Sequence, residues 1–332
     1  MTNVATTDAV VDVVLAAFNG ERYVAAQIES ILAQTLRSFR LLIRDDGSVD
    51  GTWAILEKYA ARDTRITLLQ DRTHVGHVAS FESLLQAVRA PFFALCDQDD
   101  VWHSDRLRAS VDALNVSGRA LAYSDLELVD RSGRPLGLSM WQQGRVAPLS
   151  GICTAALLIR NSVTGCSVSG RSDILRTALP FPENIPVHDW WLALVASELG
   201  GLVAISRRLV RYRQHGENVL GASGWGTTAV RARMRRFQMN LAEYAGHRRE
   251  RRIALARGLI DRQLASWQIQ FLCGYWRQPA WLRLLGAPLF GLILLALPQL
   301  RVRAAVSEFL GTCLPLDFAL RLSSRGIRPT TT

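Results

Sequence analysis

Short apolar runs alternate with amphipathic stretches over the first hundred residues. Four runs have the length and composition of buried strands, at residues 11–17, 39–43, 66–69 and 92–96. Between them, apolar side chains recur at helical spacing in residues 21–34, 53–59 and 77–89. Strands that alternate with helices of this length predict a parallel sheet with helices on both faces.

The pattern continues less regularly as far as residue 212. Apolar runs predict strands at residues 121–129, 202–205 and 209–212, and residues 190–198 have helical spacing, as does a segment around 152–160. Residues 136–150 show no clear period. We therefore expect a loop there, over the edge where the strands of the sheet end.

Polar residues follow several of the predicted strands. Asn19 comes after the first strand, Asp46 after the second, Arg72 after the third, and Asp97 and Asp99 after the fourth. In open α/β sheets, ligands bind outside the carboxyl ends of parallel strands. We therefore expect one crevice to collect these five side chains.

Three carboxylates fall within four positions in the loop after residues 92–96, at Asp97, Asp99 and Asp100. Like charges repel one another unless a cation or several hydrogen-bond donors offset the repulsion. The Asp-x-Asp spacing suits Mg²⁺ or Mn²⁺, which take oxygen ligands and share them with substrate phosphates. The spacing alone leaves a second interpretation open, a solvated acidic turn before a helix.

The positive charge of the chain is confined to its last third. The net charge is +10, and residues 221–332 hold 17 of the 39 Lys and Arg residues but only 5 of the 29 Asp and Glu residues. We expect an acidic partner to meet this part of the chain. No nucleic-acid motif accompanies the arginines, and the aromatic residues follow them instead of alternating with them, so we do not expect nucleic acid.

A shift in composition at residues 221–228 marks a domain boundary between residues 1–221 and 222–332. The second part begins with a basic helical pattern at residues 230–263. Residues 284–300 are uncharged but contain two prolines, and they fall short of the roughly 20 residues that span a bilayer. Two interpretations stay open: a helix in the membrane interface with arginines on anionic lipid, and a buried helical hairpin packed on the sheet domain.

Cysteine usage and the first residues bear on the cellular compartment. The five cysteines are odd in number and show neither CxxC nor zinc-site spacing, which argues for a reducing compartment and against a disulfide framework. Residues 1–12 lack the basic region of a signal peptide. We expect a cytoplasmic protein held peripherally at the inner face of the cell membrane.

Five short motifs occur in order within residues 10–221. They are Asn19-Gly20-Glu21, Asp45-Asp46-Gly47-Ser48, Asp97-Gln98-Asp99-Asp100, His188-Asp189-Trp190-Trp191 and Tyr212-Arg213-Gln214-His215. Each motif is weak alone, but in this order and setting they make the chain resemble the family-2 inverting glycosyltransferases. Within that family it looks most like bacterial rhamnosyltransferases that build cell-surface polysaccharides.

The resemblance implies a GT-A fold, an α/β architecture with a Rossmann-like, mixed but mainly parallel sheet flanked by helices. Residues 1–221 would form this nucleotide-sugar-binding and catalytic domain. Residues 222–332 would form a basic and apolar helical extension that associates with the membrane.

The family's motifs also imply roles for individual residues. Asp46 would contact the imide of a uracil or thymine base, and Arg72 would lie near the base or the diphosphate. Asp97 would bind the ribose or the metal, and Asp99 and His215 would be metal ligands. The ion, Mn²⁺ or Mg²⁺, would bridge the donor's phosphates and neutralise the leaving group. Further substrate-binding positions implied by the match are Asn19, Glu21, Thr164, Gly165 and Trp190.

The resemblance makes Asp189 the general base, which takes the proton from the acceptor hydroxyl as that oxygen attacks the anomeric carbon. One base and one Lewis acid suffice for a single inverting displacement. From its position before an apolar helix alone, Asp189 is equally interpreted as an N-cap. The chain departs from the commonest family pattern at Ser80, where Asn is frequent, and at Phe18, where Tyr is frequent, and both differences can alter donor choice.

The resulting hypothesis is a metal-dependent hexosyltransferase that moves a sugar, rhamnose from dTDP-rhamnose, to a hydroxyl of a lipid-linked saccharide. A UDP-sugar is the other donor consistent with the motifs. Two alternatives stay open. Polyprenyl phosphate could itself be the acceptor, in which case no sugar hydroxyl needs a base. A non-catalytic nucleotide-sugar-binding protein on the same fold would bind donors without releasing nucleoside diphosphate.

Overall fold

The computed structural model describes residues 9–144, 147–214 and 241–278. These residues divide into two compact units. The first unit comprises the described residues up to 153 together with residues 161–214, and the second comprises residues 154–160 and 241–278. Each unit is described on its own below. His215 and residues 284–300 lie outside the described residues, so the expectations for them are not tested.

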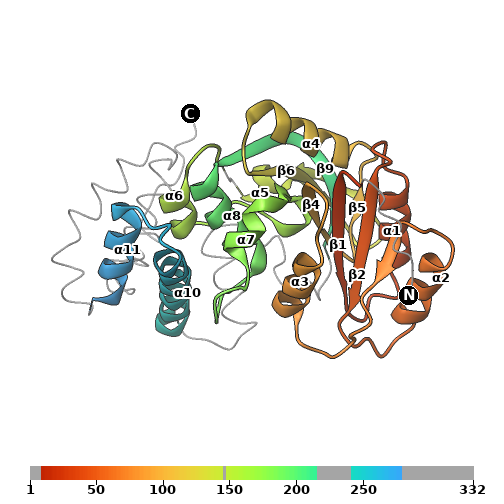
Figure 1. Ribbon diagram of the computed structural model, residues 1–332, viewed down its shortest axis with the longest axis horizontal. Helices are drawn as coiled ribbons and strands as arrows, with labels where there is room; N and C mark the ends of the chain where they lie inside the picture. The colour runs from red at the N-terminus through yellow and green to blue at the C-terminus, as the bar shows by residue number, and fades with distance from the viewer. Residues whose placement is uncertain (1–8, 145–146, 215–240, 279–332) are drawn as a thin grey trace, which may run out of the picture. The chain divides into compact units, whose positions relative to one another are not determined.

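The first unit is built on one mixed sheet, in the strand order β3-β2-β1-β4-β8-β6-β9-β5, with β7 paired to β6 (Figure 1). Its strands are β1 (Val11–Ala17), β2 (Phe39–Asp45), β3 (Ile66–Leu68), β4 (Phe92–Asp97), β5 (Val101–Trp102), β6 (Leu121–Val129), β7 (Pro135–Ser139), β8 (Ser169–Arg171) and β9 (Leu202–Arg213). The first four strands run parallel. β8 is antiparallel to both β4 and β6, whereas β6 and β9 are parallel. The expected mixed, mainly parallel sheet is confirmed.

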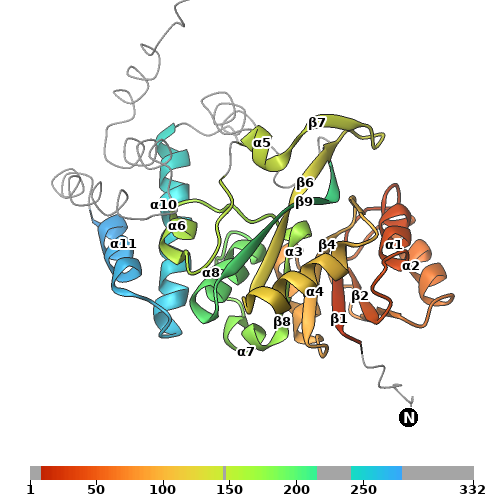
Figure 2. The same ribbon diagram turned by 90° about the horizontal axis from the view of Figure 1, so that it is seen from above.

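Helices cover both faces of this sheet (Figure 2). They are α1 (Val24–Leu32), α2 (Thr52–Ala60), α3 (His77–Gln86), α4 (Arg106–Ser117), α5 (Met140–Gly144), α7 (Leu175–Ala178) and α8 (His188–Leu199), with 3₁₀ turns η1 (Gly165–Ser167) and η2 (Ser172–Ile174). Alternate strand residues such as Val13 and Leu15 join one apolar cluster with α1, α2 and α4. Val14 and Leu42, which point to the other face, are equally buried, and α3 packs on β1 and β2.

The register of the parallel strands decides where the polar loops meet. Ala17 of β1 lies opposite Asp45 of β2, and Ala16 lies opposite Asp97 of β4. The loops after β1, β2 and β4 therefore leave the sheet at one edge. At the opposite end, the buried Asp12 carboxylate accepts two hydrogen bonds from Arg40, at 2.9 and 2.8 Å, and the backbone N–H groups of Arg89 and Ala90.

Two expectations about the later strands are wrong. Residues 136–150 are not a plain loop, because β7 and α5 occupy residues 135–144. The exposed face of β7 carries Leu136 and Leu138, so the buried-and-polar alternation that would have revealed a strand is missing. Residues 202–205 and 209–212 are one strand, β9, because the polar residues between them remain extended although they are exposed.

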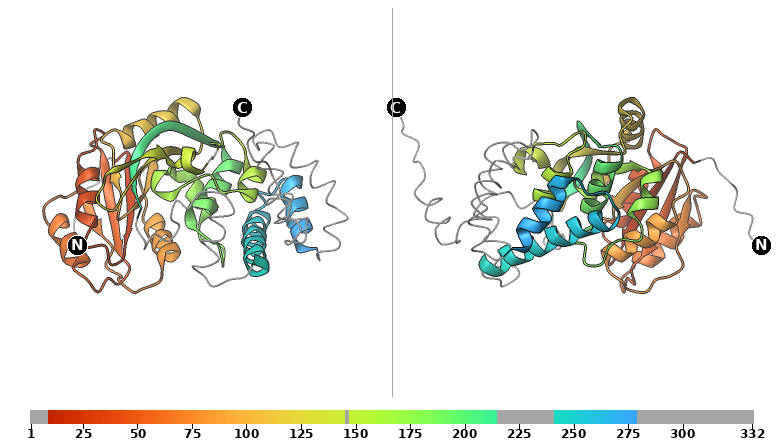
Figure 3. Two further views of the ribbon diagram at one scale, coloured as in Figure 1. Left: turned by 180° about the vertical axis from the view of Figure 1, so that it is seen from behind. Right: turned by 60° about the vertical axis from the view of Figure 1, so that its left-hand side comes forward.

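The second unit contains α6 (Thr154–Ile159), α10 (Leu241–Asp261) and α11 (Trp267–Arg277), and Figure 3 shows α10 and α11 packed side by side. Arg252 of α10 is buried, donates through Nη2 to the carbonyl of Ile159 and lies over the ring of Trp276. Leu255 and Leu259 complete the buried stripe of α10. None of the helices in the described ranges is long and apolar enough to cross a bilayer.

Candidate functional site

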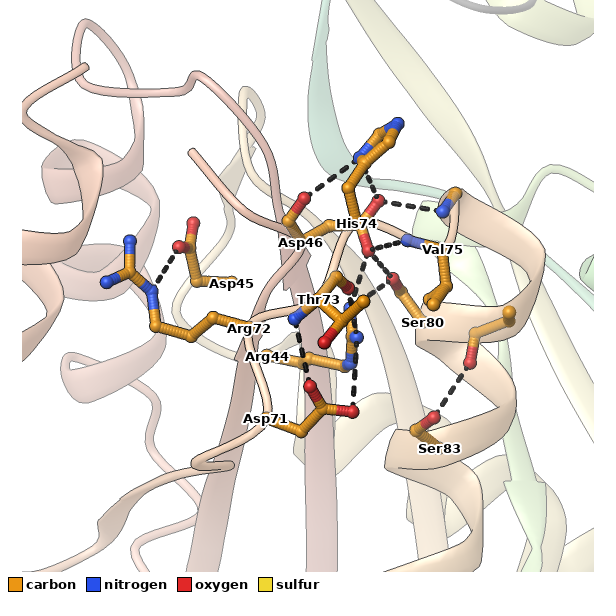
Figure 4. Close-up of polar contacts among 12 residues, drawn as sticks. Arg44, Asp45, Asp46, Asp71, Arg72, Thr73, His74, Val75, Ser80 and Ser83 are labelled. Carbon is orange, nitrogen blue, oxygen red and sulfur yellow. Dashed lines mark hydrogen bonds and ion pairs between the residues drawn. The ribbon is translucent and has the colours of Figure 1, made fainter. Parts of the chain in front are cut away.

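Asp46 lies just past β2 and is held by donors from several segments (Figure 4). Its Oδ1 accepts from Arg44 Nη1 at 2.6 Å, Ser80 Oγ at 2.9 Å and the Val75 N–H at 2.9 Å. Its Oδ2 accepts from the Gly76 N–H at 2.9 Å and lies 3.0 Å from His74 Nδ1. Asp46 is 4% exposed, so it fastens the loop before α3 to the end of β2.

The protonation state of Asp46 follows from these contacts. Burial disfavours its charge, but the hydrogen bonds from Val75, Ser80, Arg44 and Gly76 outweigh burial and lower the pKa of the carboxyl group. A further donor can be accommodated where His74 now lies, since the His74 side chain is 61% exposed. A nucleobase imide is a donor of this kind.

Arg72 is paired with a different carboxylate. Its Nε donates to Asp45 Oδ2 at 2.8 Å, and its guanidinium lies 4.2 Å from the centre of the Trp53 ring. Asp45 is fully buried and also accepts from the backbone and hydroxyl of Ser48. Arg72 therefore stands at the same edge of the sheet as Asp46, with about a third of its side chain exposed.

Asn19 and Glu21 join the loop after β1 to the loop after β2. Asn19, at a positive φ of 48°, donates from its N–H to Ser48 Oγ and accepts the Val49 N–H through Oδ1. Glu21 Oε2 accepts the Gly51 N–H at 2.6 Å. Both residues are exposed, but their side-chain oxygens accept hydrogen bonds from the loop after β2. In the described structure their contacts organise the site edge.

Gln98 joins the loop after β1 to the acidic loop, which begins at the end of β4 and carries Asp97, Asp99 and Asp100. Its side-chain amide pairs with the backbone of Phe18 twice, accepting from the N–H and donating to the carbonyl, both at 2.9 Å. An added Cβ on Gly20 would lie 2.1 Å from Gln98 Oε1, so a side chain there would displace the amide. The loops after β1, β2 and β4 are thus connected into one rim.

The carboxylates of the acidic loop influence the protonation of Asp97. Burial, followed by the charges of Asp99 and Asp189, raises the pKa of Asp97 to about 7. Asp99 is half-buried, and Arg213 Nε donates to its carbonyl at 2.9 Å. A carboxylate whose proton affinity is raised by a neighbouring negative charge is suited to binding a cation, which relieves the repulsion.

Asp100 points into the protein and connects the acidic loop to β9. It is fully buried, accepts the Arg213 N–H at 3.1 Å, and its pKa is raised well above the usual range by burial and by Asp99 and Asp97. Asp97, Asp100 and Cys166 place potential ligand atoms within 4.8 Å of one another. A thiol is a poor ligand for Mg²⁺ or Mn²⁺, and the Cys166 thiol hydrogen bonds to Asp100, so the oxygen ligands in this group are the carboxylates of Asp97 and Asp100.

Asp189 approaches the acidic loop from a distant part of the chain. It lies in the first turn of α8, is 7% exposed, and its Oδ1 has no hydrogen-bond partner among the described residues. Burial raises its pKa to about 6, although the backbone N–H groups of Trp190 and Gly165 oppose the shift. The charge of Asp189 also raises the pKa of Asp97, so the two carboxylates lie near each other.

The remaining expected residues lie near Asp189, except His215, which is outside the residues that the structure describes. A Cβ added to Gly165 would lie 3.2 Å from Asp189 Oδ2. Thr164 precedes η1 and accepts from Ser167 through its carbonyl, and Trp190 is half-buried beside Asp189 on α8. The structure therefore brings Asp97, Asp99, Gly165 and Asp189 together at the edge that also carries Asp46 and Arg72.

Sequence reasoning missed several side chains that hold this arrangement. Arg213 supports the acidic loop through the contacts above and is only 8% exposed. Arg44 is 1% exposed and neutralises Asp46 from within β2. Charged residues inside apolar runs were the available signal, because a buried arginine needs a partner. Gln98 and His74 carried no comparable signal.

Residues 12–150 match the family model "Glycosyl transferase family 2". The glucosyltransferase WfgD of Escherichia coli, named for transfer from UDP-Glc to α-D-GlcNAc-diphosphoundecaprenol, is 28% identical over 126 residues, which cover 38% of this chain and 49% of WfgD. S. aureus TarS 1–349, solved with UDP-GlcNAc, aligns with a TM-score of 0.59 at 14% identity over 94% of this chain and 92% of TarS. The mannosyltransferase PcManGT from Pyrobaculum calidifontis, solved with GDP-Man and Mn²⁺, aligns at 0.52 with 13% identity over 96% of this chain and 80% of PcManGT.

The sheet topology, the family model and the solved neighbours all indicate the same class of protein. Residues 12–150 are similar to the family-2 glycosyltransferases, and the fold is the GT-A fold of the solved neighbours. The chain spans about half to two thirds of the length of the curated relatives that it matches first.

Proposed function

We propose that this chain transfers a sugar from a nucleotide-sugar donor to a hydroxyl of a lipid-linked saccharide, with inversion at the anomeric carbon. The observation that carries the proposal is that Asp189 lies close enough to Asp97 for its charge to raise the pKa of that carboxyl, although the two residues are almost a hundred positions apart in the sequence. A base on one side and a cation-binding pair on the other are the two elements that a single displacement requires.

Asp189 is the general base in this proposal. Its raised pKa, about 6, gives the carboxylate enough proton affinity to accept a hydroxyl proton while it remains mostly ionised at pH 7. Its Oδ1, which has no hydrogen-bond partner among the residues that the structure describes, can accept that proton. A base with these properties favours a hydroxyl acceptor over polyprenyl phosphate, whose oxygens are already ionised.

Asp97 and Asp99 hold the divalent ion, and Asp100 with Arg213 keeps their loop in place. A bound Mn²⁺ or Mg²⁺ supplies Lewis-acid stabilisation to the departing nucleoside diphosphate. The mutual repulsion of the two carboxylates supports this assignment, since a cation relieves it. His215, outside the described residues, is the third ligand that the sequence motif suggests.

The nucleobase contacts Asp46 in this proposal, with its imide replacing His74. Arg72 then lies towards the diphosphate, and Asn19 with Glu21 forms the wall beside it. Uracil and thymine both carry the imide donor, so Asp46 is compatible with UDP- and dTDP-sugars alike. The sequence resemblance favours dTDP-rhamnose as the donor.

The acceptor is a saccharide on a lipid carrier, and the second unit holds the enzyme at the inner face of the cell membrane. Arg251 and Arg257 of α10 are exposed, and Trp267 at the start of α11 is 65% exposed. Exposed arginines and an exposed tryptophan are the side chains that suit the headgroup layer of an anionic membrane. Sedimentation with phosphatidylglycerol vesicles should therefore weaken in the double variant R251E/R257E and not in R108E, which alters an exposed arginine of α4.

The activity is tested with a panel of UDP-, GDP- and dTDP-sugars, Mn²⁺ and a synthetic diphospholipid carrying N-acetylglucosamine. We expect release of dTDP from dTDP-rhamnose together with a glycosylated lipid, loss of both with EDTA, and recovery with Mn²⁺. Transfer to polyprenyl phosphate but not to the saccharide would support that alternative acceptor. Donor binding without diphosphate release, with every acceptor, would make the chain a binding protein.

A further inference from the structure

His188, directly before Asp189, is a buried histidine whose nitrogens are unused. It opens α8, is 6% exposed and stacks on Phe81 of α3, with ring centres 3.8 Å apart and planes 18° from parallel. His77, one turn earlier on α3, meets it edge-on at 6.2 Å. Neither Nδ1 nor Nε2 of His188 has a hydrogen-bond partner among the described residues.

Packing against Phe81 explains why an aromatic ring is found at position 188, but it does not explain why that ring carries two nitrogens. A phenylalanine would stack on Phe81 equally well and would leave no buried polar atom unsatisfied. Buried donors and acceptors are almost always paired, and leaving them unpaired is costly. The two nitrogens therefore indicate a polar partner that is present only in a complex.

The position of His188 identifies which part of a substrate that partner belongs to. A Cβ built on Gly165 would lie 3.5 Å from His188 Nε2 and 3.2 Å from Asp189 Oδ2, so both polar atoms face one point beside Gly165. Asp189 Oδ1 is also without a partner among the described residues. A molecule whose hydroxyl reaches the base therefore brings its neighbouring hydroxyl towards His188.

His188 is uncharged at this place. Burial, followed by the neighbouring His77, lowers the pKa of its imidazole to about 3. A neutral imidazole offers one donor and one acceptor, and a sugar hydroxyl can match either. A positive charge here would instead pair with Asp189 and weaken it as a base.

We propose that His188 hydrogen bonds the acceptor hydroxyl adjacent to the one that Asp189 deprotonates, and so selects acceptor saccharides that carry a hydroxyl at that place. This inference rests on the proposed function. His188 is a specificity-determining residue in it, acting on the acceptor, whereas Asp97 and Asp99 act on the donor side.

The test compares H188F, which keeps the stack on Phe81, with H103F, a histidine to phenylalanine change at a side chain that is 43% exposed. The substrates are the turned-over nucleotide sugar and diphospholipid-linked N-acetylglucosamine, intact or lacking one hydroxyl at a time. In H188F we expect the acceptor KM to rise about 10-fold, the loss of one hydrogen bond to an uncharged group. Donor KM and nucleotide Kd should stay unchanged, and H103F should match the wild type throughout.

The deoxy acceptors test the same contact without altering the protein. One deoxy analogue should lose about 10-fold in kcat/KM with wild-type enzyme and nothing further with H188F, since the partner is already gone. Equal discrimination by both enzymes, or a rise in donor KM instead of acceptor KM, would overturn the inference. If H188F does not fold, wild-type enzyme that tolerates every deoxy analogue that keeps the reacting hydroxyl overturns it as well. Wild-type enzyme that binds nucleotide but transfers to none of these acceptors would refute the proposed function itself.

Discussion

Gly165 leaves room for Asp189 that no other residue would leave: a Cβ at Gly165 would stand 3.2 Å from Asp189 Oδ2 and 3.4 Å from its Cβ. The backbone N–H of Gly165 also hydrogen bonds to the Asp189 carboxylate. The 3₁₀ turn η1 and the first turn of α8 are therefore fitted to each other at the proposed base.

This fit predicts the effect of Gly165→Ala. The added methyl group contacts the carboxylate at a distance tighter than ordinary van der Waals packing, so Asp189 or the turn must shift by a few tenths of an ångström. We expect kcat to fall roughly 10- to 100-fold because positioning of the base is lost, while nucleotide Kd remains within about 2-fold. Steady-state kinetics and calorimetric titration with UDP and dTDP measure the two effects. An unchanged kcat would mean that the reacting hydroxyl lies elsewhere.

The pH dependence of turnover should report Asp189. Only the ionised carboxylate accepts a proton, and its pKa is raised to about 6, so kcat/KM should fall tenfold per pH unit well below pH 6. D189N should abolish turnover at every pH yet bind nucleotide normally. A rate that stays constant from pH 5 to 8 in the wild type, or activity in D189N, would remove Asp189 from this role.

Asp97 should make the metal-free protein less stable as the pH rises. Its folded-state pKa is about 7, above the unfolded value near 3.9, so its contribution to stability is complete below about pH 4 and is lost between about pH 4 and 7. The side chain of D97N cannot ionise, so the contribution of position 97 to this loss disappears, while the other buried carboxylates contribute in both proteins. Relative to the wild type, D97N should therefore gain about 3–4 kcal/mol in unfolding free energy between pH 4 and 7.5. Urea denaturation in EDTA measures this difference, and parallel pH curves for the two proteins would contradict it.

The strand and helix pattern of the sheet domain could be predicted because its parallel core is almost continuously apolar. β1, β2 and β4 are buried on both faces, and the helices between them keep a regular apolar stripe. The edge that carries Asp46, Asp97 and Asp99 follows from that pattern and from the rule that parallel strands end together. β7 could not be predicted, since Pro135 to Leu138 are all exposed and only Ser139 is buried, so no alternation is present.

The contacts within the site could be predicted only in part. The motif order brought Asp189 into consideration, but its distance from the acidic loop depends on the fold of residues 161–188, which has little local signal. The partners of Asp46 were equally hidden, because Arg44 precedes it on β2 whereas Val75, Gly76 and Ser80 come from the following helix and its approach. Long-range polar contacts of this kind follow from tertiary packing and leave no periodicity in the sequence.

The buried pair of Arg44 and Asp46 should contribute to stability as well as to nucleotide binding. Their charged atoms are 2.6 Å apart, and the two side chains are 1% and 5% exposed. Asp46→Ala leaves the guanidinium buried without this partner and removes the acceptor of the Val75 and Gly76 N–H groups, so we expect a loss of about 3–5 kcal/mol in unfolding free energy. Urea denaturation at pH 7 measures it.

Two further variants distinguish the contribution of the buried Arg44–Asp46 pair from the general effect of removing a charge. Asp71 lies 3.8 Å from Arg44 but is 71% exposed, so Asp71→Ala should leave the denaturation midpoint nearly unchanged. R44M/D46A removes both charges, and its loss should be smaller than the sum of the losses in R44M and D46A, because neither partner is left buried alone. Strict additivity, or a D46A protein as stable as D71A, would show that the Arg44–Asp46 contact does not bear on folding.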